Sequence, residues 1–212
     1  GAGRAVLAAL SGAVNVNAQV VTANGQIMVS ADTDVNLAGV SKVLKSSAAQ
    51  DIAVQAGQDI LMLAATSLET NGAGIALHAG RDVDLAKVDA GTATSGDVWV
   101  HAGGDIADVN AGTINAMGQS LVMRAGSGIG AANDYLETTV SQLAAQSLSG
   151  SYVAQSQALE IAALSQSFDA TNLSDLSAST WSSSQNGLVA TDTTTGGDLV
   201  VRVALGDLTV NE

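Results

Sequence analysis

A short strand pattern recurs through this chain at a fixed interval. The pattern, in which apolar residues alternate with other residues, starts at Ile52, Ile75, Val98 and Leu121, so each start lies 23 residues after the last. An earlier copy starts at Ile27, slightly more than one such interval before Ile52. A fixed period in this range is the sequence signature of a solenoid, in which each repeat forms one coil and buries its apolar face only when the next coil stacks on it.

Each copy also carries a second apolar position eight residues after its start. These positions are Ile60, Val83, Ile106 and Ile129. Strands alternate with a period of two residues, whereas a helical solenoid needs runs of about ten or more residues at helical spacing. Gly and Asp interrupt this chain too often for such runs. The sequence therefore predicts an all-β fold, a parallel β-solenoid (β-helix) with about 23 residues per coil and coils about 4.8 Å apart.

The alternation predicts which side chains point into the solenoid. The expected inward pairs are Ile27/Val29, Ile52/Val54, Ile75/Leu77, Val98/Val100 and Leu121/Met123. A third, weaker strand in each coil is expected at Leu68, Val88 and Ile114. The composition suits a narrow interior, because 47% of the residues are hydrophobic and only 2% are aromatic. Proline is absent, so the corners depend on Gly, Asn and Asp, which tolerate positive φ.

The charge balance excludes one class of partner and favours a soluble, exported protein. The formal net charge is −13, with only seven Lys and Arg, whereas binding of nucleic-acid phosphates needs clustered basic residues. An acidic surface keeps an extended repeat protein in solution. Cysteine is absent, which excludes disulfides and thiolate metal sites, and no stretch approaches the ~20 apolar residues of a membrane span. We therefore expect no nucleic-acid partner and no membrane span.

The chain is expected to be a single β-solenoid segment of a larger protein, over residues 1–212. Regular coils are expected at 25–130, irregular coils and loops at 131–195, and a terminal coil at 196–212. Within the irregular part, 133–147 fits either a short helix behind an Asn133 cap or a longer coil. The next coil is expected to start at Tyr152, a longer step from Leu121 than the regular interval. The Ser- and Thr-rich stretch 165–195 is expected to form a loosely patterned coil or a surface loop.

Several repeat segments resemble a known group of bacterial proteins. AGQDILMLA, AGRDVDLA and HAGGDIADVNAGTINA resemble the haemagglutinin-type repeats of filamentous-haemagglutinin-like and giant adhesins, many of which are exported by two-partner secretion. The segment GSGIGAANDYLETTVSQLAAQSLSGSYVAQSQALEI resembles a stretch that recurs in such surface proteins. The resemblance covers most of 25–161 and, weakly, 186–210. It implies a right-handed parallel β-helix, extracellular display on the bacterial surface, and adhesion or biofilm matrix building, and it carries over no catalytic residues.

Four aspartates recur at one position of the coils, namely Asp34, Asp59, Asp82 and Asp105. Stacked at strand spacing, neighbouring carboxylates repel by roughly 1 kcal/mol per pair in water. We expect a structural turn ladder, in which each carboxylate accepts backbone N–H groups at the corner. Bound Ca²⁺ is the alternative, since Ca²⁺ prefers oxygen ligands. The calcium-binding nonapeptide repeat is absent as an array, so no cofactor is expected.

A second column collects both histidines and two of the seven Lys and Arg residues. The outward position three residues into each strand is occupied by Ser30, Gln55, His78, His101, Arg124, Gln155 and Arg202. With Trp99 beside it, this column is a candidate binding face for polysaccharide or a host-surface ligand, through His78, Trp99, His101 and Arg124. The alternative is a solvated outer face. Two stacked imidazoles can share a metal, but no third ligand accompanies them, so no metal site is expected.

A third column is apolar although it points outward. It consists of Met28, Ala53, Ala76, Trp99 and Val122. Such a column is unusual on a solvated face, so we expect it to pack beneath a loop, for which 165–195 is the candidate, rather than to form a contact surface.

These observations favour a structural rod segment of a secreted, cell-surface adhesin. The alternatives are a carbohydrate-binding face on the rod and a β-helix enzyme that degrades polysaccharides. Such an enzyme needs convergent carboxylates in a cleft. The nearest candidates, Asp82/Asp84 and Asp105/Asp108, are explained by corner chemistry, and no nucleophile-elbow motif occurs. We therefore expect no enzymatic activity, and the neighbouring coils of the parent chain are the expected structural partners.

Overall fold

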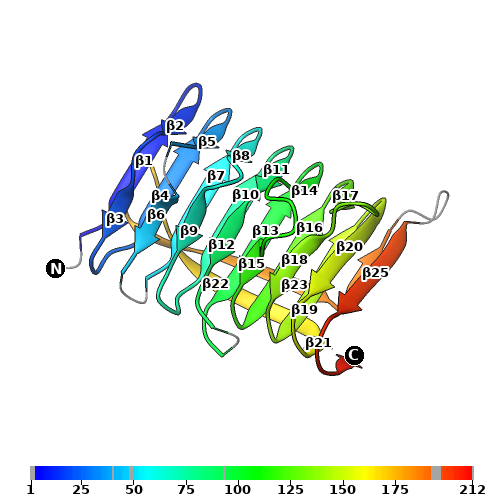
Figure 1. Ribbon diagram of the computed structural model, residues 1–212. Coiled ribbons are helices and arrows are strands. Elements are labelled where there is room, and N and C mark those ends of the chain that lie inside the picture. Colours follow the sequence, from blue (N-terminus) through cyan, green and yellow to red (C-terminus); the bar gives the residue numbers. More distant parts are fainter. Residues whose placement is uncertain (1–2, 40, 48–49, 93, 192–196, 212) are drawn as a thin grey trace.

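The computed structural model is all-β (Figure 1). It describes residues 3–39, 41–47, 50–92, 94–191 and 197–211, and these ranges contain no helix. The chain winds repeatedly through two large sheets, in which every strand pair is parallel. The molecule is therefore a parallel β-solenoid, and its coils have the length that the repeat predicts, because bonded residues of consecutive regular coils such as Asp59 and Asp82 are one repeat apart.

The first sheet has ten strands, which come from successive coils. Its order is β1 (Ala5–Ala9), β4 (Ile27–Ala31), β7 (Ile52–Ala56), β10 (Ile75–Ala79), β13 (Asp97–Ala102), β16 (Ser120–Ala125), β19 (Gln142–Ser147), β21 (Leu159–Ile161) and β26 (Leu208–Val210), and β24 (Leu188–Ala190) also pairs with β19.

The second sheet has fourteen strands and folds back on itself through β20. One arm is β2 (Val14–Val16), β5 (Val35–Leu37), β8 (Ile60–Met62), β11 (Val83–Leu85), β14 (Ile106–Asp108) and β17 (Gly128–Ile129). The other arm is β18 (Leu136–Thr139), β15 (Ala116–Met117), β12 (Lys87–Asp89), β9 (Ser67–Glu69), β6 (Lys42–Ser46) and β3 (Val20–Thr22). Strand β20 (Gly150–Gln155) pairs with β17, β18 and β25 (Asp198–Val203).

The strand register confirms the regular spacing and extends it. Ile52, Ile75, Val98 and Leu121 are partners in consecutive strands. The same row continues in both directions, from Ala5↔Ile27 at one end to Leu121↔Leu143 at the other. All ten residues of the expected inward pairs are buried with 0% exposure. The apolar interior thus runs without interruption along the row of coils, as stacking of in-register coils requires.

The corners after the first-sheet strands need glycine because adjacent coils approach closely there. A Cβ at Gly80 would lie 2.2 Å from the carbonyl oxygen of Gly57, and one at Gly103 would lie 2.1 Å from the oxygen of Gly80. These glycines do not have positive φ. Their role is to admit the backbone of the preceding coil, and the expectation that corner glycines supply positive φ is wrong for this column.

The expected third-strand residues Leu68 and Val88 are confirmed as register partners in β9 and β12. Ile114 is not their equivalent. The residue opposite Val88 is Ala116 of β15, because the loop between β14 and β15 is longer than the pattern suggests. Because Ala116 is small, this inward position gives little hydrophobic signal, and the sequence pattern pointed to Ile114 instead.

The expected coil start at Tyr152 is wrong. Leu121 pairs with Leu143, which lies close to one regular interval further along the chain, so the repeat does not lengthen there. Tyr152 lies in β20 of the other sheet. The helix alternative for 133–147 is also wrong, because β18 and β19 occupy that range with a corner between Thr139 and Gln142. This corner changes the phase of two alternating strands, which places Leu136, Val140 and Leu143 at helical spacing by coincidence.

Residues 163–186 form an antiparallel hairpin instead of a coil or loop. Its strands are β22 (Ala163–Thr171) and β23 (Ala178–Asn186), and they lie behind the first sheet, across successive coils (Figure 1). We call this element the covering hairpin. Residues 192–196 of the expected loop lie outside the described residues. The terminal coil is confirmed over its described part, since β25 and β26 pair with β20 and β21.

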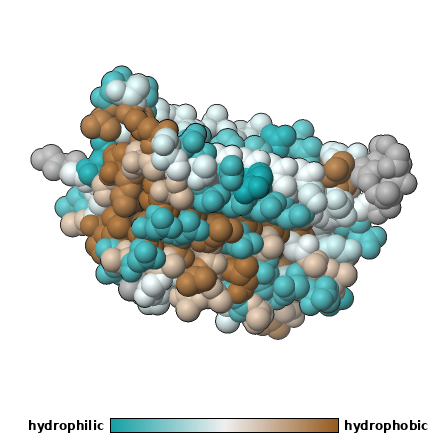
Figure 2. All heavy atoms as spheres, turned by 90° about the horizontal axis from the view of Figure 1, so that it is seen from above, coloured by the Kyte–Doolittle hydropathy of each residue, from teal (hydrophilic) through white to brown (hydrophobic). Residues whose placement is uncertain are grey.

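The covering hairpin buries the outward apolar column, as the sequence predicts. Met28, Ala53, Ala76, Trp99 and Val122 are all at most 9% exposed. The last three form a second apolar cluster together with Ala144 of β19 and Phe168 of the hairpin, and Leu164 and Trp181 pack against it. Elsewhere, Figure 2 shows hydrophobic and hydrophilic side chains interspersed along the outer face.

We expect Leu77→Ala to lower the free energy of unfolding by about 2–5 kcal/mol, because Leu77 is fully buried in the apolar interior of the solenoid. Leu205→Ala is the matched control, since Leu205 is 72% exposed, and its effect should stay within about 0.5 kcal/mol. Urea denaturation followed by far-ultraviolet circular dichroism measures both values. Equal effects of the two changes would contradict the assignment of the core.

Candidate functional site

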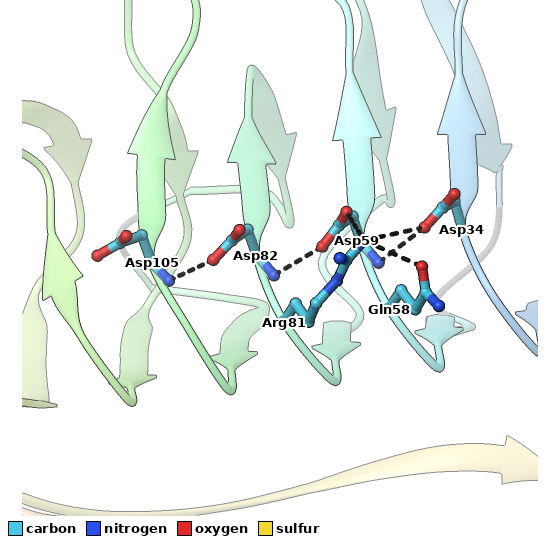
Figure 3. A network of polar contacts seen from close by, with 6 residues as sticks. All are labelled: Asp34, Gln58, Asp59, Arg81, Asp82 and Asp105. Atoms are coloured by element: carbon cyan, nitrogen blue, oxygen red, sulfur yellow. Dashed lines mark hydrogen bonds and ion pairs between the residues drawn. The ribbon is translucent and has the colours of Figure 1, made fainter.

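The aspartate ladder (Asp34, Asp59, Asp82 and Asp105) joins successive coils (Figure 3). Oδ1 of each aspartate accepts a hydrogen bond from the backbone N–H at the equivalent position of the next coil. The N···O distances are 3.2 Å for Asp59 to Asp34, 3.1 Å for Asp82 to Asp59, 2.7 Å for Asp105 to Asp82 and 2.7 Å for Gly128 to Asp105. The expected backbone donors are confirmed, but they come from the neighbouring coil and not from the same turn.

This geometry explains why four stacked carboxylates are tolerated. A hydrogen bond to a charged acceptor contributes about 1.5–3 kcal/mol, which exceeds the roughly 1 kcal/mol of repulsion between neighbouring charges in water. Arg81 offsets part of the remaining repulsion, since its guanidinium donates to Asp59 Oδ2 at 2.5 Å and lies 4.0 Å from Asp34. Arg81 also donates to Gln58 at 3.0 Å. The ladder therefore stabilises the corner.

Metal ligation was the alternative for the ladder and for the two histidines. Among the residues that the structure describes, no group of three or more His, Cys, Asp or Glu side chains is arranged to hold a metal ion. The ladder oxygens are directed along the row of coils, each toward one N–H group. The expectation that the chain holds neither Ca²⁺ nor another cofactor stays a prediction.

The outward column brings His78, His101 and Arg124 together in consecutive strands, as predicted. The two imidazole rings lie 4.6 Å apart, and the Trp99 ring stacks 6.2 Å from His101. Trp99 is only 9% exposed, because Phe168 covers it at 6.1 Å. Trp99, which the sequence analysis includes in the candidate binding face, is therefore covered by the hairpin. His101 and Arg124 remain accessible.

The histidine pair lies in a partly buried setting. Trp181 of the covering hairpin approaches His78 edge-on at 6.4 Å. Burial lowers the pKa of His78. Burial, followed by the nearby His78 and Arg124, lowers the pKa of His101. Both imidazoles are therefore held toward the neutral form, and protonation of either is opposed by its surroundings.

The column does not continue through Gln155 and Arg202. The partner of Arg124 is Gln146 of β19, which is in turn the partner of Val189. Gln155 is buried inside the solenoid, where it donates to the Val140 carbonyl at 2.7 Å and accepts from Thr138 at 2.7 Å. Arg202 lies on the other sheet, 4.3 Å above the Tyr135 ring.

Two shallow hollows meet at Arg124. One, of about 240 Å³, is lined by His101, Arg124, Gln146, Leu148 and Thr191 together with small residues of the coil corners. The other, of about 310 Å³, lies between the column and the end of the covering hairpin, and it is lined by Arg124, Gln146, Ser184, Gln185, Asn186 and Val189. Sequence analysis missed Gln146 because its strand was assigned to a helix or longer coil.

Sequence analysis also missed the residues that anchor the covering hairpin. Asp51 Oδ1 accepts from Gly74 N at 2.7 Å, and its Oδ2 accepts from Asp169 N of the hairpin at 2.6 Å. Gln166 donates to the Ser120 hydroxyl at 2.7 Å. A Cβ at Gly74 would lie 2.5 Å from Phe168 Cδ1, so the ring packs here only over glycine.

Asp108 is one of the carboxylates that could serve a polysaccharide-degrading enzyme, and it belongs to a polar corner of the solenoid. Its Oδ1 accepts from Asn115 Nδ2 at 2.7 Å and from Asn110 N at 2.8 Å. Asn115 is fully buried and also accepts from Glu137 N at 2.8 Å. Burial and, next, the charge of Asp108 raise the pKa of Glu137. The hydrogen bonds of the buried Asn115 therefore hold neighbouring coils together at this corner.

Comparison of the chain with protein-family models, curated proteins and solved structures found no match. The resemblance to filamentous-haemagglutinin-like adhesins therefore rests on the repeat segments of the sequence, while the solenoid fold rests on the structure. Within the described part of the chain, no helix has the length and hydrophobicity needed to cross a membrane.

We expect Asp82→Ala to destabilise the fold by about 1–2 kcal/mol, because the N–H of Asp105 loses its charged acceptor. Asp82→Asn retains an acceptor oxygen and should cost less than half as much. Asp84→Ala is the matched control. Burial, Asp82 and Asp59 raise the pKa of Asp84, so its removal should be neutral or slightly stabilising. Urea denaturation at neutral pH measures all three, and an equal loss for Asp82→Ala and Asp84→Ala would contradict the ladder.

The histidine pair predicts a pH dependence of stability. Because the folded chain lowers both pKa values, the unfolded chain takes up protons first as the pH falls below about 6.5, and the free energy of unfolding decreases. The decrease ends once the folded chain is protonated too. Asp51 acts oppositely, because burial raises its pKa and its protonation favours the folded chain, but in a lower window near about pH 4.

Urea denaturation between about pH 7.5 and 5.5, followed by tryptophan fluorescence, measures this dependence. The native chain should lose stability across this range, and the double variant His78→Gln/His101→Gln should lose much less. A double variant with the same pH slope as the native chain would show that other groups carry the effect.

Proposed function

We propose that this chain is a structural rod segment of a secreted adhesin of the filamentous-haemagglutinin-like kind, displayed on the bacterial cell surface. The observation that supports it most is the continuous register of the first sheet from β1 through β19. Backbone hydrogen bonds join each coil to the next, and the aspartate ladder adds a bond at each step from Asp34 to Gly128, which makes a stiff scaffold from simple repeats. The resemblance of its repeat segments adds the extracellular, adhesive setting and two-partner secretion.

We further propose that the chain is not an enzyme. Three of the four paired carboxylates that a polysaccharide-degrading enzyme would use have structural partners, since Asp82 and Asp105 accept ladder hydrogen bonds and Asp108 accepts from Asn115. A carbohydrate-binding face is the second candidate function. It is favoured by the accessible His101 and Arg124 beside the two hollows.

A rod that works outside the cell should resist proteases while it holds the parts of the protein attached to it. In a surface display that places the chain between a membrane anchor and a binding tag, the native chain should keep its tag during protease treatment. Val100→Asp puts a charge into a fully buried position and should lose the tag at least about tenfold faster, because proteolysis follows the population of opened chain.

Gln55→Asp, at an exposed outward position, is the matched control and should behave like the native chain. Cleavage of the native chain as fast as Val100→Asp would contradict the rod function. Release of products from uronic-acid polymers by the purified chain would contradict the absence of enzymatic activity.

A further inference from the structure

Arg124 differs from the five other Lys and Arg residues whose side chains the structure describes. Arg81 pairs with Asp59, Lys45 with Glu69 and Lys87 with Asp89, while Arg4 donates to Thr171 and Arg202 lies over Tyr135. The side chain of Arg124 is exposed, and within the described ranges it makes no ion pair, hydrogen bond or ring contact. In a chain of net charge −13, it is an unneutralised cation.

The described residues that line the two hollows at Arg124 include no Asp or Glu. The charged neighbours that affect the pKa of the adjacent His101 are His78 and Arg124, both basic. The covering hairpin presents Ser184, Gln185 and Asn186 at this end, while Asp169 lies at its other end against Asp51. Among the residues that the structure describes, an anion that approaches Arg124 therefore meets neutral hydrogen-bonding groups and no carboxylate.

The hollows on either side of Arg124 have the size and chemistry for sugar rings. At about 240 and 310 Å³ they lie at or below the lower end of the roughly 300–1,000 Å³ of pockets for drug-sized ligands. The side-chain amides of Gln146 and Asn186 offer both donors and acceptors, which match sugar hydroxyl groups. The guanidinium offers a planar fork of N–H donors, which matches a carboxylate.

We propose that Arg124 and these two hollows bind an acidic oligosaccharide, with the guanidinium on the carboxylate of a uronic acid and Gln146 and Asn186 on hydroxyl groups. This inference deepens the carbohydrate-binding function, the second candidate above, and rests on it. The rod function is independent of it. Since the two hollows adjoin at Arg124, an oligosaccharide can occupy both while one of its carboxylates stays on the guanidinium.

Isothermal titration with tetragalacturonate tests the site in the full chain. Arg124→Gln should weaken binding about tenfold or more, because a charged hydrogen-bonding pair is lost. Arg202→Gln is the matched control, since it removes the same charge from an exposed position on the other sheet, and it should leave the affinity unchanged. Circular dichroism of both variants verifies that they fold.

Three comparisons decide the interpretation. Equal losses for Arg124→Gln and Arg202→Gln would overturn the site, because net charge alone would then explain binding. A neutral galactose tetramer that binds as tightly as tetragalacturonate would overturn the acidic-sugar assignment and leave the carbohydrate face standing, whereas tetraglutamate binding as tightly would overturn the sugar class. Absence of binding of every oligosaccharide at about 1 mM would overturn this inference and the carbohydrate face together.

Discussion

Backbone hydrogen bonds between one coil and the next determine almost every other feature of this molecule. They run at the same position in each coil, as in Gly80 N to Ala56 O at 3.1 Å and Gly103 N to Ala79 O at 3.1 Å. Because this pairing is parallel and in register, equivalent residues must form columns. One column fills the interior, one carries the aspartate ladder, and one brings two histidines and an arginine together. The chemistry of each column follows from one backbone constraint.

The regular coils could be predicted from sequence because large aliphatic residues fill both inward positions of each first-sheet strand. The prediction fails where the inward residues are small and differ little in hydrophobicity from their neighbours in the sequence. Ala5 in β1 and Ala145 in β19 occupy inward positions with small side chains, so neither strand stands out from its surroundings. At β20 one long strand continues both arms of the second sheet, and a pattern built on three strands per coil cannot anticipate this.

The candidate site was predictable to the extent that it depends on columns. The neighbours His78, His101 and Arg124 follow directly from the spacing. What they face does not, because the covering hairpin contacts strands that are distant in sequence, as in the bond between Gln166 and Ser120. Its polar alternating strands resemble a surface loop, and only the buried apolar column beneath reveals that something must cover it. The burial of Trp99 and the hollow beside Asn186 both follow from that element.

The covering hairpin also changes how the row of coils holds together. In a plain solenoid each coil touches only its neighbours, so the ends can fray while the middle stays folded. Here one hairpin is bonded to Gln26 and Asp51 near one end and to Ser120 further along, and it packs on Ala144 beyond that. Coils that would otherwise open one at a time are thereby linked in parallel to a common element. These coils are then expected to unfold together in one cooperative transition. The terminal coils should therefore fray less than those of a solenoid without such a hairpin.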